Sequence, residues 1–392
     1  MHLFVTKANC LLVMMLLFSD KYQIMTSFLL PLSSMRSWVA PVVVFGAIPQ
    51  YCIAHNTWRC LKMIVPRRLY DTVDEFMYDS YQTLITFFYE SFNCTQVYFY
   101  GDQLPTDKKE NVIYISNHQA AIDWVISDFV AIRQGSTGRL RYIMKMFFKY
   151  FPWYGPYFYQ RGCIFVNRGG KDSDEAIRRD LRQFQRDRVG GYWLVIFPEG
   201  TRYSTSKPDA FEKSRDFAKA KGLTPYNNVL FPRSRAFQFA LTELRESLDA
   251  VYDLTIGYKI PWLPSLPRRD GPSILQFLAL QGQEIHIHVR RIPIEEMPRD
   301  EALQKKWLYS AFERKDKLMQ DFLDESVEPL FPGKQYEIPL KKRKVLSHVL
   351  FYSLLLGFSL SSAETRKWYA RSWIATFCGS MIGAPLFYRF LN

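Results

Sequence analysis

Short apolar runs alternate with longer amphipathic stretches between residues 111 and 330 of this 392-residue chain. Runs rich in β-branched and aromatic residues predict buried strands at residues 111–116, 163–166, 192–196, 251–256 and 284–289. Helical spacing of apolar positions predicts helices at residues 120–133, 139–150, 172–187, 209–221, 234–247 and 299–323. This alternation predicts an α/β fold, in which helices flank a mixed, largely parallel sheet.

Polar side chains directly follow two of the predicted strands. Residues 117–123 read Asn-His-Gln-Ala-Ala-Ile-Asp after the first strand, and residues 197–202 read Phe-Pro-Glu-Gly-Thr-Arg after the third. In open α/β sheets, sites form just beyond the carboxyl ends of the strands. We therefore expect one histidine, one aspartate, one glutamate and one arginine to gather in a single crevice.

Four segments together resemble the blocks of the glycerolipid acyltransferases, which transfer an acyl group from acyl-CoA to a glycerol hydroxyl. His-x-x-x-x-Asp at 118–123 and Phe-Pro-Glu-Gly-Thr-Arg at 197–202 resemble the first and third blocks. Gly-Cys-Ile-Phe-Val-Asn-Arg at 162–168 resembles the second block, and Val-Leu-Phe-Pro-Arg at 229–233 resembles the fourth. All four blocks occur in the order of this family and at plausible spacing, which makes the resemblance specific. Over residues 100–332 the sequence resembles 1-acylglycerol-3-phosphate acyltransferases of the epsilon type.

Acyl transfer from a thioester to an alcohol needs a base for the hydroxyl proton and a group that stabilises the oxyanion. His118 is the candidate base, and Asp123 is the candidate partner that fixes its tautomer and stabilises the imidazolium. On one regular helix, residues five apart lie roughly 140° from each other. The two side chains can therefore meet only if His118 precedes the helix and Asp123 lies in its first turns.

The resemblance also implies roles for other residues. Arg168 and the third block would bind the glycerol-phosphate head of the acceptor, and the fourth block would line the acyl-CoA side. From charge alone, Glu199 would repel phosphate, so it more simply holds a hydroxyl or orders Arg202. Asn117 either caps the following helix or bonds His118. The predicted substrate-binding residues are Asn117, Arg168, Glu199, Gly200, Thr201, Arg202, Pro232 and Arg233.

Other enzyme chemistries find less support in the sequence. The chain has no Gly-x-Ser-x-Gly motif, and a direct attack by the acceptor hydroxyl requires no serine or cysteine nucleophile. The six cysteines form no Cys-x-x-Cys pair. His286 and His288 alternate on one strand, and a packed or hydrogen-bonded pair is a simpler interpretation than a metal site. We expect no metal or organic cofactor, with acyl-CoA as co-substrate.

The chain is basic and rich in apolar residues. It has 51 Lys and Arg against 38 Asp and Glu, which gives a formal net charge of +13, and 48% of its residues are hydrophobic. It lacks zinc-finger, basic-zipper and RNA-recognition signatures, so we expect no nucleic acid as a partner. An anionic phospholipid membrane, acyl-CoA and lysophosphatidic acid are the expected partners.

Apolar segments near both ends predict membrane attachment. Residues 38–54 are uncharged, and basic residues downstream place that end in the cytosol under the positive-inside tendency. The aromatic stretch 76–99 predicts a helical pair lying in the interface. Four basic residues at 341–344 precede the apolar runs 345–362 and 372–391, which predict a membrane hairpin. We predict an N-terminal membrane-anchoring region at 1–99, a catalytic domain at 100–335 and a C-terminal hairpin at 336–392.

These observations predict an integral membrane enzyme that acylates the sn-2 hydroxyl of lysophosphatidic acid to give phosphatidic acid. The same chemistry on another lysophospholipid or on lysocardiolipin is an alternative. A non-catalytic membrane protein that binds lipid is an alternative of another class. The resemblance implies the endoplasmic reticulum membrane, with the mitochondrial outer membrane as the alternative, and a catalytic domain facing the cytosol.

Overall fold

A seven-stranded sheet forms the centre of the computed structural model, which describes residues 35–167, 172–186, 191–205, 208–260, 270–279, 282–324 and 329–383. The strands run in the order β1-β7-β6-β2-β5-β3-β4. Neighbouring strands are parallel except for the antiparallel pair β6 and β7. The prediction of a mixed, largely parallel sheet is therefore confirmed. The strand bounds are β1 Gln96–Gly101, β2 Val112–Ser116, β3 Leu140–Lys145, β4 Ile164–Val166, β5 Trp193–Ile196, β6 Ala250–Lys259 and β7 Glu284–Pro293.

Alternate residues of β2 belong to two different cores, which explains why this strand is apolar throughout. Val112 and Tyr114 lie in one core, and Ile113 and Ile115 lie in the other. A parallel strand in the middle of a sheet is covered on both faces and has no side that contacts water. Burial on both faces holds the carboxyl end of β2 in place, and the loop that follows β2 carries the first polar motif.

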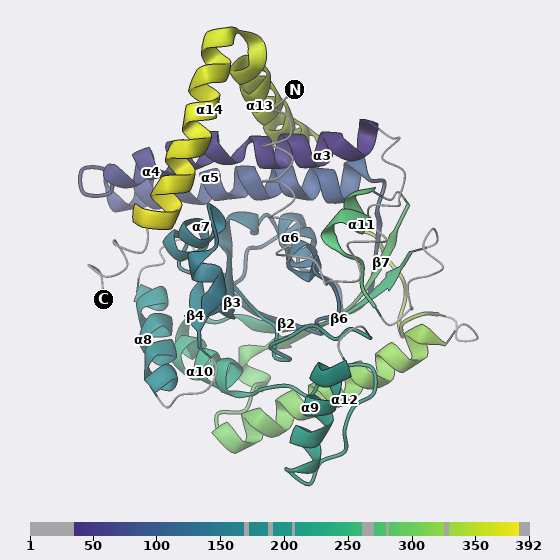
Figure 1. The fold of residues 1–392 in the computed structure, drawn as a ribbon. Helices are drawn as coiled ribbons and strands as arrows, with labels where there is room; N and C mark the ends of the chain where they lie inside the picture. The colour runs from purple at the N-terminus through teal and green to yellow at the C-terminus, as the bar shows by residue number, and fades with distance from the viewer. Residues whose placement is uncertain are drawn as a thin grey trace.

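Helices cover both faces of the sheet (Figure 1). One face carries α6 (Asp123–Gln134) and α7 (Tyr154–Gln160), with a further helical layer above them. The other face carries α8 (Asp172–Arg186), α10 (Arg235–Leu244) and α12 (Glu301–Leu323), and α9 (Pro208–Lys219) lies on this side as well. The short helix α11 is Ile274–Ala279. Short 3₁₀ helices are Thr137–Arg139, Met146–Tyr150, Arg245–Ser247 and Ile294–Glu296.

The further layer consists of α3 (Met35–Gly46), α4 (Ile48–Cys60) and α5 (Arg67–Thr86), as Figure 1 shows. The segment Trp38–Cys60 is long and apolar enough to span a membrane. Half of its most apolar 18-residue stretch is buried in the structure. Pro41 lies inside α3. Pro49 lies in the first turn of α4, a position where proline's missing N–H is tolerated. This segment contains the apolar stretch that the sequence predicted as the N-terminal span.

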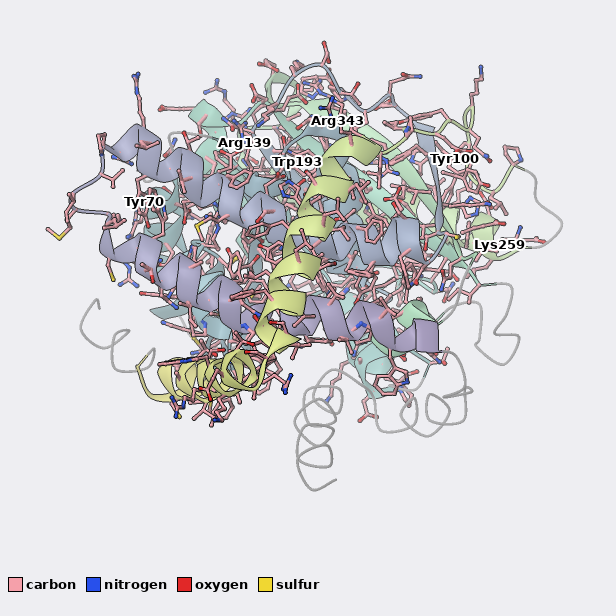
Figure 2. The ribbon with its side chains drawn as sticks, turned by 90° about the horizontal axis from the view of Figure 1, so that it is seen from above. Tyr70, Tyr100, Arg139, Trp193, Lys259 and Arg343 are labelled. Carbon is pink, nitrogen blue, oxygen red and sulfur yellow. The ribbon has the colours of Figure 1, made fainter. Side chains whose placement is uncertain are left out.

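Two further helices, α13 (Lys342–Ser361) and α14 (Ala363–Cys378), pack on the same layer. Figure 2 shows α13 crossing α5 and α3, with Arg343 near its start. The Tyr352 hydroxyl of α13 forms a 2.9 Å hydrogen bond with Ser80 Oγ of α5. Together the two helices are long and apolar enough to span a membrane, but they meet at a bend of 114°. Residues 384–391 of the second predicted apolar run lie outside the described residues.

Two predicted elements are wrong. Residues 139–150 form β3 and a short 3₁₀ helix, Met146–Tyr150, instead of one helix. Residues 76–99 do not form a helical pair in an interface, because α5 continues into a π-helical turn, Phe87–Phe92, and the chain then enters β1. The consecutive residues from Tyr78 to Thr86 are all buried. The domain boundary predicted at residues 99 and 100 falls inside β1.

Candidate active site

His118 and Asp123 meet beyond the carboxyl end of β2. Nδ1 of His118 lies 2.7 Å from Oδ2 of Asp123. The helix α6 begins at Asp123, so His118 lies in the strand-to-helix loop, which is the arrangement that the five-residue spacing requires. The loop is short because β2 ends at Ser116.

The Asp123 carboxylate accepts hydrogen bonds on both oxygens. Oδ2 also accepts the backbone N–H groups of Gln119 and Ala120 at 2.8 and 3.0 Å, and Oδ1 accepts the hydroxyl of Tyr258 at the end of β6. The side chain of Asp123 is only 1% exposed. Four donors compensate for its loss of hydration, and they fix the carboxylate in a single orientation toward the imidazole.

The His118 imidazole is held on one face and open on another. Its ring stacks on Phe197 with ring centroids 4.5 Å apart and an angle of 26° between the planes. The side chain is 21% exposed. Because Nδ1 contacts Asp123, Nε2 is the ring nitrogen that remains to contact a substrate.

Glu199 joins two loops of the site. Oε1 accepts the backbone N–H of His118 at 2.8 Å, and Oε2 accepts the backbone N–H of Leu230 at 3.0 Å. Burial raises the pKa of the Glu199 carboxyl well above its usual range, although the two backbone N–H groups act in the opposite direction. Both of these hydrogen bonds come from backbone N–H groups. The sequence predicted that Glu199 would hold a hydroxyl or order Arg202, and these two hydrogen bonds show neither role.

A tight turn connects Phe197 to the rest of the third motif. Gly200 has φ = +66°, a left-handed conformation that costs glycine little. The Gly200 N–H donates to the carbonyl oxygen of Phe197 at 2.9 Å, and the Tyr203 N–H donates to that of His118 at 2.7 Å. The turn therefore carries Thr201 and the half-buried Arg202 past the histidine loop.

Other predicted site residues occupy different surroundings. The Asn117 side chain exchanges two hydrogen bonds, at 2.8 and 2.9 Å, with the backbone of Ile256 on β6, so it neither caps α6 nor bonds His118 in these contacts. Pro232 is buried and Arg233 is exposed, and the Arg233 N–H donates to the Pro198 carbonyl at 2.8 Å. Arg168 lies outside the described residues.

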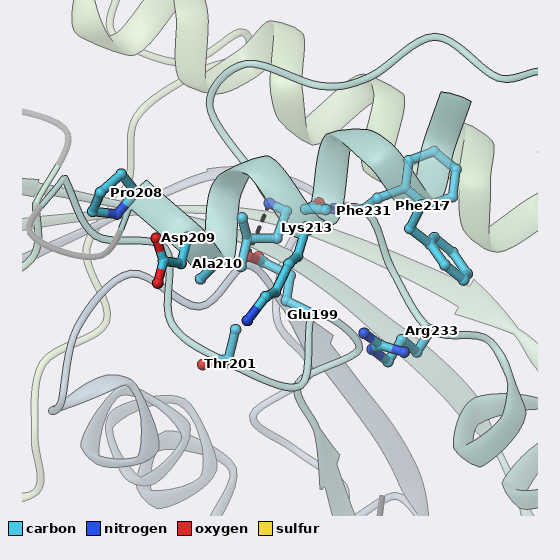
Figure 3. Close-up of a pocket in the computed structure, with 11 residues that line it drawn as sticks. Glu199, Thr201, Pro208, Asp209, Ala210, Lys213, Phe217, Phe231 and Arg233 are labelled. Atoms are coloured by element: carbon cyan, nitrogen blue, oxygen red, sulfur yellow. Dashed lines mark hydrogen bonds between the residues drawn. The ribbon is translucent and has the colours of Figure 1, made fainter. Parts of the chain in front are cut away.

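A pocket of about 560 Å³ opens between the third motif, the fourth motif and α9. Its lining includes Glu199, Thr201, Lys213, Phe217 and Arg233. Figure 3 shows the Lys213 side chain extending from α9 toward Thr201, with Arg233 at one end. His118 is not part of the lining, but Glu199 contacts both the pocket and the His118 backbone.

The two histidines on β7 are both packed against aromatic rings, and His286 is also hydrogen bonded. His286 Nδ1 lies 2.9 Å from the Tyr100 hydroxyl, and burial lowers the pKa of His286 to about 4. Burial also lowers the pKa of His288. In the described residues, no three His, Cys, Asp or Glu side chains are grouped to hold a metal ion.

Sequence reasoning missed Tyr258 because the strand prediction stopped at Ile256. In the structure β6 extends to Lys259 and pairs in parallel with β2, which carries Tyr258 past the carboxyl end of β2. Residues 257–259 read Gly-Tyr-Lys, so the single aromatic side chain of Tyr258 was the available signal that the strand continued. Phe197 lies in a predicted motif, but no sequence pattern indicates that its ring stacks on His118.

Comparisons with known proteins show which family this chain belongs to. The family models for the acyltransferase domain and the acyltransferase C-terminus match residues 96–247 and 276–352. The chain is 38% identical to 1-acyl-sn-glycerol-3-phosphate acyltransferase epsilon of Mus musculus, over 90% of this chain and 96% of that protein.

It is 34% identical to probable 1-acyl-sn-glycerol-3-phosphate acyltransferase 5 of Arabidopsis thaliana, over 73% of this chain and 75% of that protein. The crystal structure of a 1-acyl-sn-glycerophosphate acyltransferase from Thermotoga maritima matches with a TM-score of 0.41 at 14% identity, over 73% of this chain and 95% of that chain. The share of both chains that aligns with the mouse protein, together with the acyltransferase domain, shows that this chain belongs to the 1-acyl-sn-glycerol-3-phosphate acyltransferase family of enzymes.

Proposed function

We propose that this protein transfers an acyl group from acyl-CoA to the sn-2 hydroxyl of lysophosphatidic acid, which yields phosphatidic acid. The observation that carries the proposal is the 2.7 Å contact between His118 Nδ1 and Asp123 Oδ2, which leaves Nε2 for the substrate. The names of the mouse and Arabidopsis relatives support the choice of acceptor.

In the proposed mechanism, His118 acts as a general base and then as a general acid. The acceptor hydroxyl attacks the thioester carbonyl carbon while its proton passes to Nε2, and Asp123 stabilises the imidazolium that forms. The tetrahedral oxyanion then collapses and the C–S bond breaks. The departing thiolate takes the proton from Nε2, which returns His118 to the neutral state.

Each part of the site supports one requirement of this mechanism. The donors around Asp123 hold the tautomer that exposes the lone pair of Nε2, and Phe197 fixes the plane of the ring. Arg202, together with Arg168, would bind the acceptor phosphate. The reaction needs no metal or organic cofactor, because the thioester is already activated and His118 supplies the base.

We propose further that the catalytic domain lies in the cytosol and is held at a membrane by Trp38–Cys60 and by α13 and α14. The endoplasmic reticulum is the proposed location, with the mitochondrial outer membrane as the alternative. Deleting residues 345–392 should weaken membrane attachment without abolishing it. A truncated protein that is fully soluble without detergent would rule out the N-terminal span.

The activity test uses purified full-length protein, labelled acyl-CoA and a panel of lysophosphatidic acid, other lysophospholipids and lysocardiolipin. We expect the highest kcat/KM with lysophosphatidic acid, and transfer slower by ~10²–10⁴-fold with His118→Ala. Preference for lysocardiolipin or another lysophospholipid would replace the proposed acceptor. Folded protein that binds lipid but acylates none of the panel would favour a non-catalytic role.

A further inference from the structure

The pocket beside the third motif is basic on the side that faces α9. Lys213 and Arg233 both line it, and Lys221 lies close by, with its ammonium nitrogen 5.0 Å from the centroid of the Phe217 ring. The Arg233 guanidinium carbon lies 5.5 Å from the centroid of the same ring. Both cations therefore contact the ring of Phe217, which itself lines the pocket. An anion in the pocket would offset the positive charge gathered on this side.

Among the described residues, Lys213, Lys221 and Arg233 form no ion pair with a carboxylate. The acidic residues of the lining are Asp209 and Glu199. Figure 3 shows Asp209 at the end of the pocket away from Arg233. Burial raises the pKa of Glu199 well above its usual range, and both of its oxygens accept backbone N–H groups, so its repulsion of an anion is reduced. The basic end of the pocket therefore suits a polyanion.

The position of the pocket separates it from the apolar helices. Figure 1 shows α9 and α12 on one side of the sheet, and α3, α4 and α5 on the opposite side. A lysolipid acceptor keeps its acyl chain in the bilayer, so its phosphate is expected to approach from the side of the apolar helices. The water-soluble end of the donor has no such restriction. A volume of about 560 Å³ lies within the range of roughly 300–1,000 Å³ that is usual for small-molecule sites and exceeds what a glycerol-phosphate head needs.

The pocket is also close to the site of chemistry. Glu199 forms part of its wall, and Oε1 of the same residue accepts the His118 N–H at 2.8 Å. On its other side, the pocket is closed by α9, which is fixed to the fourth motif because the Phe231 N–H donates to Ser214 Oγ at 2.7 Å. Through Glu199 the pocket therefore adjoins the loop that carries His118.

We propose that this pocket binds the phosphorylated nucleotide end of the acyl donor, the adenosine bisphosphate of CoA, with Lys213, Lys221 and Arg233 contacting its phosphates. This inference rests on the proposed function, because it names the binding site of that reaction's donor. It adds Lys213, Lys221 and Phe217, on and beside α9, to a donor side for which the sequence motifs indicated only Pro232 and Arg233.

The direct test measures binding of CoA and of adenosine 3′,5′-bisphosphate to the detergent-solubilised full chain by calorimetry, with no lipid acceptor present. Lys213→Ala should raise both dissociation constants about tenfold. This is the lower end of the range expected for loss of a hydrogen bond to a charged group, because the Lys213 side chain is exposed. Lys213→Glu should raise them further. Lys219→Ala is the matched control, since it removes another exposed lysine of α9 that does not line the pocket.

Phe217→Leu provides a second variant, which keeps an apolar side chain but removes the ring that holds Arg233 and Lys221. It should weaken binding of both nucleotides while leaving the thermal unfolding temperature close to that of the wild type. Equal dissociation constants for Lys213→Ala, Lys213→Glu and Lys219→Ala would overturn the proposal.

Steady-state kinetics separate this inference from the proposed function. If Lys213→Ala raises the KM for acyl-CoA and leaves the KM for lysophosphatidic acid unchanged, both hold. If transfer proceeds and only the KM for lysophosphatidic acid rises, the pocket belongs to the acceptor and the inference fails, although the function stands. If the wild type binds CoA in a manner that depends on Lys213 but acylates no lysolipid, the pocket is confirmed and the proposed function fails.

Discussion

Tyr258 donates a hydrogen bond to Oδ1 of Asp123 across 135 residues of sequence. The other oxygen of the same carboxylate contacts the His118 imidazole, so a tyrosine at the end of β6 acts on the candidate base through the aspartate. Tyr258 is buried, and burial raises the pKa of its hydroxyl well above the usual range, which keeps it a hydrogen-bond donor at neutral pH. We regard it as a positioning residue.

Tyr258→Phe should lower kcat about three- to tenfold, because Asp123 keeps its other three donors and loses one hydrogen bond worth about 1 kcal/mol. Without this donor the carboxylate interacts more strongly with the imidazolium. The acidic limb of the pH–rate profile should therefore move to higher pH. Unchanged kcat and pH profile would show that the contact does not affect catalysis, and a fall in unfolding temperature alone would show a purely structural role.

His118→Ala removes the candidate base and should lower kcat by ~10²–10⁴-fold. Substrate affinity should change little, because the imidazole acts mainly while the proton moves. Asp123→Asn preserves the shape but offers a donor where Nδ1–H needs an acceptor, so it should be nearly as damaging. The double mutant should be scarcely slower than His118→Ala, because the two residues act as a unit. Near-normal transfer by folded His118→Ala protein would disprove the mechanism.

Arg202→Ala should raise the KM for lysophosphatidic acid by about tenfold to a hundredfold, since a charge-assisted phosphate contact contributes ~1.5–3 kcal/mol. We expect Arg168→Ala to act in the same direction. The KM for acyl-CoA should change much less. Arg235→Ala is a suitable control, because its exposed side chain contacts Asp174 on the surface. A change confined to acyl-CoA would mean that these arginines serve the other substrate.

Lys315 of α12 is buried and lies 2.5 Å from Asp253 on β6. Burial lowers the pKa of Lys315, and Asp253 acts in the opposite direction. Lys315→Ala should destabilise the protein by about 3–5 kcal/mol, because it leaves a buried carboxylate with weaker compensation. Lys306→Ala, an exposed lysine of the same helix, should have almost no effect on thermal unfolding. Equal unfolding temperatures for both variants would contradict a stabilising role.

Stability should depend on pH through His286. Burial lowers its pKa to about 4 in the folded state, against about 6.5 when unfolded, so the unfolded chain binds more protons between these values. The free energy of unfolding should therefore fall as the pH is lowered from about 6.5 to 4, by roughly 2–3 kcal/mol. His286→Gln, which cannot titrate, should have a shallower dependence in chemical denaturation at several pH values. An unchanged slope would exclude this residue as the cause.

Elements with a single strong pattern could be predicted from the sequence. The strands β2 and β5 are apolar on both faces, and the polar motifs after them fixed where the candidate base and its partner lie. The dyad geometry followed from the spacing, because the helix could begin only after His118. The α12 helix was also predicted, and Asp300 caps it by accepting the Leu303 N–H at 2.9 Å.

The misread strand β3 shows where this reasoning fails. Arg141, the second residue of β3, is buried. Its guanidinium donates to the carbonyl oxygens of Gly138 and Leu140 and lies over the Tyr78 ring. A buried arginine disrupts the alternation that marks a strand, and the basic residues at four-residue spacing resemble the polar face of a helix. Lys315 on α12 is likewise buried, beside Asp253 of β6, although lysine is usually exposed on a charged helix. In both cases a contact with residues distant in the sequence determines where the side chain lies.

The bridge made by Glu199 has a consequence for how the enzyme matures. Its carboxylate fastens the His118 loop, 81 residues earlier, to the Leu230 loop, 31 residues later. Contacts between residues so distant in the sequence form late, because chain entropy opposes them. During synthesis on the ribosome, a chain that has emerged only as far as β5 already contains the histidine and aspartate but lacks the Leu230 contact. Catalytic competence is therefore acquired only when most of the sheet has assembled, so truncated chains shorter than this point should be inactive even if they reach the membrane.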